Sequence, residues 1–170
     1  MALLGHNGAG KTTTINMVTG ILGPDQGDVI VNGKSIVYEI DEARKDLGLC
    51  QQHDVLYELL TVRENLQLAC ELKDVPRECV ESEITEILKL TMLTEHSEKL
   101  ISELSGGMKR KLSLGMSIVS KPSVIILDEP SSGLDVESRR QIWDLIRKIK
   151  QGRAIIMSTQ HIEEADELAD

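Results

Sequence analysis

The sequence predicts an α/β domain in which a parallel central sheet is interrupted by an inserted helical subdomain. Four short apolar segments have the composition of strands buried on both faces: residues 2–5, 47–50, 123–127 and 154–158. Polar or helical sequence separates them, which is the alternation typical of an α/β sheet. Between residues 61 and 120 no strand pattern appears. We therefore expect one domain over residues 1–170, with its core formed by residues 1–60 and 121–170 and the helical subdomain by about 61–120.

The remaining elements follow from local patterns along the chain. A helix is expected at residues 12–18, directly after a glycine-rich loop. Residues 28–34 alternate apolar and polar side chains and end in Asn32-Gly33, a hairpin-turn signal, so we expect a smaller antiparallel piece there. In the helical subdomain, the patterns predict a helix near 64–73, an amphipathic helix over 78–90 after Pro76, and a third helix that begins after residues 106–107.

Composition and charge argue against several classes of protein. The formal net charge of −9 argues against a nucleic-acid-binding protein, because such proteins usually carry a basic patch. No apolar run approaches the roughly 20 residues that a membrane-spanning helix needs, so the chain itself is not expected to span a membrane. The cysteines Cys50, Cys70 and Cys79 lack metal-ligand spacing, and their odd number does not suit a disulfide framework. These features favour a reducing, cytosolic setting.

The segment GHNGAGKTTT at residues 5–14 predicts a loop that binds nucleotide phosphates. It fits the pattern G-x-x-x-x-G-K-[ST] through Gly5, Gly10, Lys11 and Thr12. Glycines let backbone N–H groups curl around phosphate oxygens, and the following helix directs its positive end at them. A glycine-rich turn that only caps a helix is the alternative, but the strand before it and the helix after it favour phosphate binding. A dinucleotide site does not fit, because Thr13 stands where G-x-G-x-x-G needs its last glycine.

Within this loop the side chains have separate tasks. Lys11 is expected to place its charge toward the β- and γ-phosphates, and the Thr12 hydroxyl to ligate Mg²⁺. The fold class is therefore that of a P-loop NTPase. The expected nucleotide-binding residues are Gly5, His6, Asn7, Gly8, Ala9, Gly10, Lys11, Thr12 and Thr13.

Two acidic residues, Asp128 and Glu129, follow the apolar segment at 123–127 directly. Open α/β sheets bind ligands at the carboxyl edge of their strands, so both carboxylates are expected at the site. Asp128 would hold Mg²⁺ through its water shell, and Glu129, facing the other way, would polarise an attacking water. Two acidic residues at the end of a strand are often only solvent-exposed residues at the surface of a sheet. The phosphate loop in the same chain favours a role for them in the nucleotide site.

A second anion-binding pattern lies at Ser105, Gly106 and Gly107, immediately before a predicted helix. Free N–H groups and a hydroxyl at a helix N-terminus favour an anion, although a serine N-cap with two glycines is the default structural interpretation. One nucleotide does not need two such sites on one chain. Two copies related by a two-fold axis would explain both, each holding the nucleotide between its own loop and its partner's serine-glycine turn.

Taken together, these motifs resemble those of the ATP-binding cassette (ABC) ATPases over nearly the whole chain. GHNGAGKTT is similar to the Walker A motif, CQQHD contains the Q-loop glutamine, and LSGGM at 104–108 is similar to the signature motif. IILDEP is similar to Walker B, SSGLD at 131–135 to the D-loop, and STQHIEEAD to the segment with the switch histidine. Six motifs in the order of that family leave little room for coincidence.

The resemblance implies further residue roles. Catalysis would involve Glu129 as the catalytic glutamate, His161 at the γ-phosphate and Gln52, which would also sense Mg²⁺. The implied magnesium ligands are Thr12, Asp128 and Gln52. The implied signature residues, which would bind the ATP of a partner cassette, are Leu104, Ser105, Gly106, Gly107 and Met108. Asp135 would communicate across the dimer. By themselves, His161 would be a surface histidine opening a helix and Gln52 an ordinary loop residue.

The amino-acid sequences of the motifs are similar to those of subfamily A, the eukaryotic lipid exporters. Departures are Gln51 and Val136, where that subfamily commonly has proline, while Met108 replaces the glutamine of the wider family. The resemblance implies an ATP-hydrolysing cassette on the cytosolic face of a membrane, where nucleotide-driven dimer closure powers lipid transport. Its partners would be a second cassette and a transmembrane domain, docked by the apolar segment at 54–62. The alternatives are a soluble ABC ATPase acting on ribosomes or DNA, and a cassette without hydrolysis.

The resemblance also predicts that the chain is a cassette truncated at both ends. Cassettes of this family normally begin with antiparallel strands that carry an aromatic residue stacked on adenine, whereas here the first aromatic residue is Tyr38. They also continue beyond the switch histidine with more sheet and helix. We therefore expect the N-terminal antiparallel strands to be missing, and an isolated chain of this length to be prone to aggregation.

Overall fold

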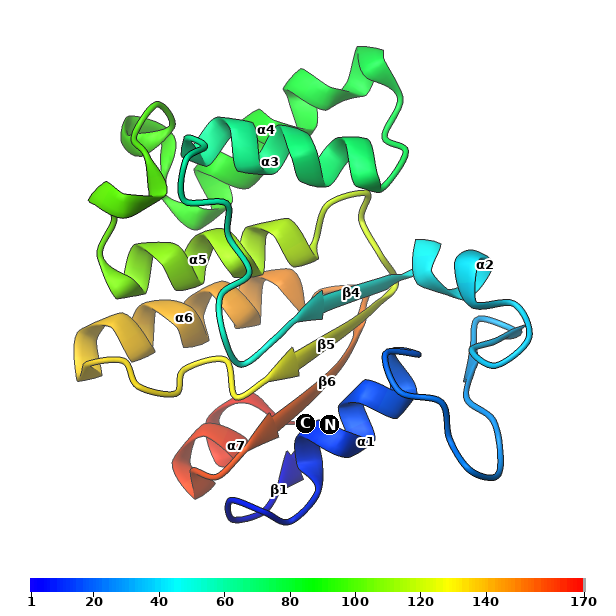
Figure 1. Ribbon diagram of the computed structural model, residues 1–170. Coiled ribbons are helices and arrows are strands. Elements are labelled where there is room, and N and C mark those ends of the chain that lie inside the picture. Colours follow the sequence, from blue (N-terminus) through cyan, green and yellow to red (C-terminus); the bar gives the residue numbers. More distant parts are fainter. Residues whose placement is uncertain (170) are drawn as a thin grey trace.

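The computed structural model describes residues 1–169 and has a four-stranded parallel sheet at its centre (Figure 1). The strands are β1 (Ala2–Leu4), β4 (Leu47–Cys50), β5 (Val124–Asp128) and β6 (Ala154–Thr159), in the spatial order β1-β6-β5-β4. Pairing is parallel throughout, with Ile126 opposite Leu49 on one side and opposite Ile156 on the other. The predicted α/β fold with a parallel central sheet is confirmed. Asp170, the predicted end of the domain, lies outside the described residues.

Helices cover both faces of this sheet. Successive side chains of a strand point to opposite faces. On β5, Ile126 therefore packs with Ile15 of α1 (Lys11–Val18), whereas Ile125 and Leu127 pack on the other face with α5 (Gly106–Ser117) and α6 (Val136–Ile149). All three β5 residues are completely buried, so the strand reads as a continuous apolar run. Figure 1 shows α5 and α6 along one side of the sheet and α1 on the other.

The segment between β4 and β5 is helical, as the absence of a strand pattern predicts. It holds α3 (Val62–Leu72), α4 (Arg77–Thr91) and α5, with short 3₁₀ turns at Thr94–His96 and Ile101–Glu103. A capping box begins α3, since the Glu64 N–H donates to Thr61 Oγ1 at 3.2 Å and the Thr61 N–H to Glu64 Oε2 at 2.7 Å. The helix thus begins two residues before the predicted start. One isolated antiparallel bridge, Thr61 to Leu100, is the only extended pairing described within this segment.

Smaller elements surround the sheet. β2 (Ile30–Val31) and β3 (Lys34–Ser35) form the predicted antiparallel hairpin. Its two turn residues, Asn32 and Gly33, have φ of 48° and 81°, as a type I′ turn requires.

α2 (Ile40–Lys45) and α6 are additional helices that the sequence patterns above did not identify. α7 (Ile162–Leu168) begins after His161, so the histidine does precede a helix. No helix within residues 1–169 is long and apolar enough to cross a bilayer.

Close packing between β4 and α5 fixes the helical segment against the sheet. A Cβ added at Gly48 would stand against the Ser117 carbonyl oxygen, closer than van der Waals contact allows. Glycine at this point of β4 therefore permits α5 to approach the strand backbone. Because α5 also contacts α3, α4 and α6, this approach holds the whole helical segment against the sheet.

Candidate nucleotide site

The glycine-rich loop joins β1 to α1 and opens onto the carboxyl edge of the sheet. Gly8 and Gly10 have φ of 83° and 89°, conformations that L side chains rarely adopt, and a Cβ at either position would meet no atom within 4 Å. Gly10 is the N-cap of α1, which begins at Lys11. The loop therefore leaves open space beside backbone N–H groups at a helix N-terminus, which is the arrangement that binds phosphate.

A cavity of about 350 Å³ lies at this N-terminus. Its lining comes from three separate parts of the chain: Asn7, Gly8, Ala9, Gly10, Lys11, Thr12, Thr13, Gln52 and Glu129. Gln52 follows β4 and Glu129 follows β5, and parallel strands end at the same edge of a sheet. The topology thus brings two predicted catalytic side chains to the phosphate loop. Three other hollows, of about 620, 220 and 470 Å³, have no residue of the glycine-rich loop in their lining.

Lys11 and Glu129 form a buried ion pair in the wall of the cavity. Lys11 Nζ lies 3.2 Å from Glu129 Oε1, and the two side chains are only 6% and 7% exposed. The same ammonium donates to the Gly5 carbonyl at 2.7 Å and to the His6 carbonyl at 3.2 Å. The loop carbonyls thus hold the lysine above α1, with its charge directed at the cavity.

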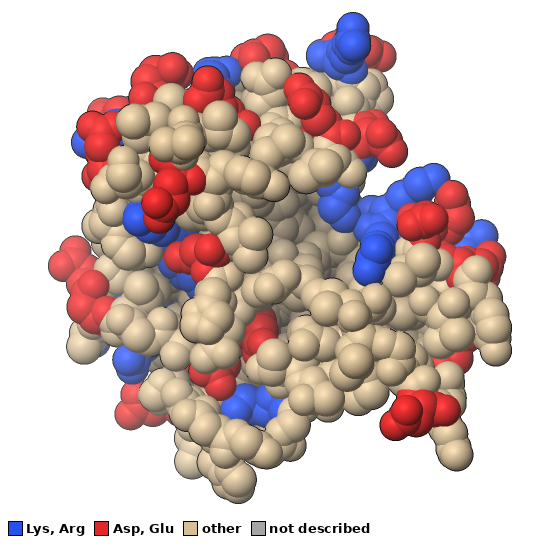
Figure 2. All heavy atoms as spheres, in the orientation of Figure 1, with Lys and Arg blue, Asp and Glu red and all other residues tan. Residues whose placement is uncertain are grey.

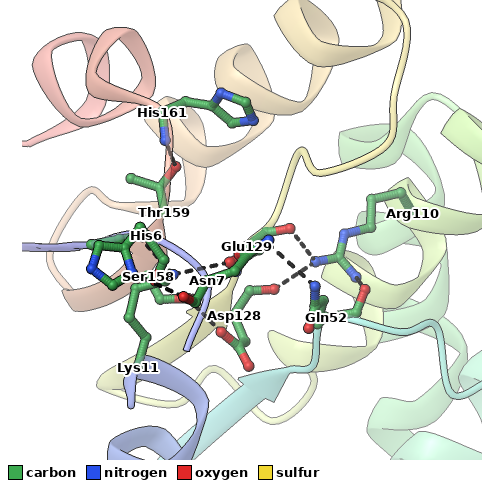
Figure 3. Close-up of polar contacts among 11 residues, drawn as sticks. His6, Asn7, Lys11, Gln52, Arg110, Asp128, Glu129, Ser158, Thr159 and His161 are labelled. Atoms are coloured by element: carbon green, nitrogen blue, oxygen red, sulfur yellow. Dashed lines mark hydrogen bonds and ion pairs between the residues drawn. The ribbon is translucent and has the colours of Figure 1, made fainter. Parts of the chain in front are cut away.

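Glu129 is held in an unusual backbone conformation just beyond β5. Its φ is 45°, in the left-handed region, where a non-glycine residue is strained. Its N–H donates to Ser158 Oγ at 3.0 Å and to the Ser158 carbonyl at 3.1 Å. Its Oε2 accepts from Gln52 Nε2 at 3.3 Å (Figure 3). The strand ends at Asp128, so strand alternation does not set the direction of the Glu129 side chain.

Asp128 lies deeper than the cavity wall. It is 3% exposed, it is absent from the cavity lining, and its Oδ1 accepts a hydrogen bond from the Ser158 hydroxyl. Of the three implied magnesium ligands, Thr12 and Gln52 line the cavity directly. Residues 1–169 contain no group of three His, Cys, Asp or Glu side chains that could hold a metal ion. Mg²⁺ suits such a sparse set, because it keeps several waters and takes its other ligands from phosphates.

His161 does not join the cavity lining. It is the N-cap of α7, and its N–H donates to Thr159 Oγ1 at 3.0 Å. Figure 3 shows the ring pointing away from Lys11 and Glu129. The structure therefore brings Gln52 and Glu129 to the phosphate loop but leaves the histidine ring outside it.

The serine-glycine turn and the D-loop lie next to each other, away from the cavity. Ser105 is the N-cap of α5 and accepts from the Met108 N–H at 3.3 Å. A Cβ added at Gly107 would lie 2.6 Å from Ser138 Oγ, so α5 and α6 require glycine there to pack. The Ser138 hydroxyl donates to Asp135 Oδ2 at 2.7 Å, and this hydrogen bond lowers the pKa of the Asp135 carboxyl. Within one chain, Ser105 and Asp135 therefore act as helix caps.

Two residues at the site were not found from the sequence. Ser158 contacts both acidic residues, and Arg110 of α5 donates to backbone carbonyls on either side of the cavity. Neither belongs to a spacing pattern that predicts such contacts. Cys50, next to this region, is buried, and burial raises the pKa of its thiol to about 11, which favours the protonated thiol at neutral pH.

Comparison with known proteins agrees with this geometry. A family model described as "ABC transporter" matches residues 1–132. The chain is 46% identical over 170 residues to ATP-binding cassette sub-family A member 2 of Rattus norvegicus. This match covers 100% of the chain and 7% of that protein. It is 47% identical over 169 residues to the human retinal-specific phospholipid-transporting ATPase ABCA4, and 48% over 172 residues to the human glucosylceramide transporter ABCA12. These matches cover 99% of this chain and 7% of each relative.

The chain thus spans about 7% of the length of each of these three relatives, whose names place them in subfamily A. The family match covers well over half of the chain. It includes the phosphate loop, the serine-glycine turn, Asp128 at the end of β5 and Glu129 after it. The chain belongs to the ABC transporter family.

Proposed function

We propose that this domain binds Mg-ATP at the α1 cavity and hydrolyses it to power the transport of lipids across a membrane. The observation that carries the hydrolytic part is the meeting of Lys11, Gln52 and Glu129 in one cavity at a helix N-terminus. The lipid part rests on the similarity to relatives named as phospholipid-transporting ATPases and as a glucosylceramide transporter.

In the proposed reaction the loop and Lys11 hold the phosphates. The γ-phosphate competes with Glu129 for the Lys11 ammonium, so nucleotide binding frees the carboxylate from its ion pair. Glu129 then accepts a hydrogen bond from the attacking water and orients it for in-line attack, with Gln52 beside it. Mg²⁺, held by Thr12 and Asp128, would supply charge neutralisation at the phosphates. Phosphoryl transfer depends chiefly on positioning and charge stabilisation, which this set of residues can supply.

A second cassette completes the proposed site. Ser105, Gly106 and Gly107 lie outside the cavity of their own chain, at the N-terminus of the twelve-residue helix α5. In a two-fold dimer each signature turn, Leu104 to Met108, would face the ATP on the partner's phosphate loop. Asp135 adjoins that turn through Ser138, which supports a role in communication between the two cassettes. Closure would also bring the α7 N-terminus with His161 toward the γ-phosphate.

A transmembrane domain would dock beside the Q-loop. Two adjoining hollows of about 620 and 220 Å³ share Leu49, Leu72, Lys73 and Met116. Figure 2 shows the face between the helical segment and α2 hollowed, with basic side chains gathered beside it. Arg44, Lys45 and Lys73 line the larger hollow. In the adjoining segment 54–62, Val55, Tyr57 and Leu59 are 62%, 55% and 90% exposed, which suits a docked apolar helix. The cassette would then lie on the cytosolic face.

The transport proposal is tested with the full-length protein in liposomes that contain fluorescent phospholipid. Mg-ATP is expected to drive phospholipid from one leaflet to the other, and a non-hydrolysable ATP analogue is not. Lys148→Met, an exposed change on α6, should leave the rate unaltered. Hydrolysis without any ATP-dependent lipid movement, in a protein that does not co-purify with membranes, would instead favour the soluble cassette ATPases.

A further inference from the structure

Arg110 is a buried arginine in the second turn of α5, five residues after the N-cap Ser105, and it is 4% exposed. Its guanidinium reaches the two loops that end β4 and β5 (Figure 3). The acceptors are the carbonyls of Pro130 (2.7 Å), Asp128 (3.0 Å), Glu129 (3.1 Å), Gln51 (2.6 Å) and Gln52 (3.2 Å), and Asp54 Oδ1 (3.1 Å).

These contacts join the two side chains proposed to handle the attacking water. The carbonyls of Gln52 and Glu129 both accept from Arg110, while their side chains meet each other at 3.3 Å. A guanidinium is planar, so a single rigid group sets the distance between the two backbones. The separation of Gln52 from Glu129 is thus fixed from both sides.

Arg110 is one of the groups that hold the strained backbone of Glu129. The Glu129 N–H donates to Ser158, and the Glu129 carbonyl accepts from Arg110 Nη2 and from the Ser132 N–H, each at 3.1 Å. A residue persists at a φ of 45° only where its surroundings determine its conformation. Arg110 is the one of these groups that also contacts the loop after β4, so its loss would remove a restraint on Glu129 and let the Glu129 carboxylate shift relative to Gln52.

Among residues 1–169, the carboxylate partner of Arg110 is Asp54. Its side chain, 26% exposed, accepts from Arg110 at 3.1 Å and from the Ser113 hydroxyl of the same helix at 2.8 Å. All other acceptors are backbone carbonyls on two different loops. A lysine ammonium is a point donor on a flexible stem and cannot span both loops as the guanidinium fork does.

We propose that Arg110 is a positioning residue for ATP hydrolysis, which sets the Gln52–Glu129 geometry and ties it to the helix that begins at the signature turn. The inference rests on the proposed function of Glu129. A movement of α5 at a dimer interface is transmitted through this one side chain to the hydrolytic pair. Arg110 itself does not line the nucleotide cavity, so it acts through its neighbours.

The test is Arg110→Lys in the full-length protein, compared with Lys148→Met and combined with Glu129→Gln. We expect Arg110→Lys to lower kcat at least about 10-fold while KM for ATP changes by less than about threefold, because ground-state binding does not use Arg110. Lys148→Met should leave both unchanged. If Arg110 acts through Glu129, adding Arg110→Lys to Glu129→Gln should alter the residual rate by less than about threefold.

Several outcomes would overturn the proposal. One is a kcat of Arg110→Lys within about threefold of the unmodified protein, and another is an equal fractional loss in the Glu129→Gln background. If Arg110→Lys does not yield folded protein, Asp54→Ala decides: we expect kcat to fall at least about threefold at unchanged KM, and an unchanged kcat overturns the proposal. Normal turnover by Glu129→Gln alone would refute the proposed function instead, so the two failures are distinguishable.

Discussion

Replacing Glu129 by Gln is expected to lower the rate of ATP hydrolysis at least about 100-fold while ATP still binds. The amide has nearly the shape of the carboxylate but cannot accept the proton of an attacking water. The substitution also removes the ion pair with Lys11, which lies 3.2 Å from Glu129, so the ammonium becomes fully available to the phosphates. ATP affinity should therefore be equal or higher. Steady-state hydrolysis and equilibrium binding of labelled ATP measure the two effects separately.

A matched change of charge elsewhere controls for this result. Glu78→Gln alters an exposed carboxylate in the first turn of α4, far from the cavity in sequence and outside its lining. It should leave hydrolysis and binding unchanged. If Glu129→Gln hydrolyses ATP as fast as the unmodified protein, then Glu129 is not the group that handles the water.

Replacing Lys11 by Met is expected to weaken ATP binding at least about 100-fold, equivalent to about 3 kcal/mol. Two effects combine, because the phosphates lose a charged donor and Glu129, 7% exposed, keeps its negative charge without its partner. That charge would then repel the nucleotide. Binding of labelled ATP to the full-length protein measures the loss, with Lys148→Met as the control. Binding within about threefold of normal would show that the phosphates do not use Lys11.

The sequence could predict the sheet because buried parallel strands have a strong local signal. Each of the four apolar segments forms a strand whose bounds differ from the prediction by one residue or less, and Asn32 and Gly33 form the turn of a hairpin. The six-residue helix α2 has no such signal, since no side chain caps it. For α6 the signal exists: Ile142, Leu145, Ile146 and Ile149 recur with helical spacing and are buried. The apolar pattern would have predicted that helix.

The site could be predicted only where a motif stands for a local conformation. The loop residues around Lys11 and the acids after β5 follow from the chain next to them, and parallel strands bring the two together. Ser158 and Arg110 contact Glu129 although they lie 29 and 19 residues from it in the sequence. The residues next to each of them in the sequence show no pattern that predicts these contacts. For Ser105, Asp135 and His161 the single chain offers helix-capping positions, and their proposed roles need the second cassette.

The most direct test is the structure of the full-length Glu129→Gln protein determined with Mg-ATP. We predict the γ-phosphate in the α1 cavity, within hydrogen-bonding distance of Lys11 Nζ, with the partner cassette's serine-glycine turn facing it from across the dimer interface. Nucleotide bound in the larger hollow between α2 and α3, or a γ-phosphate that Lys11 does not contact, would contradict the account.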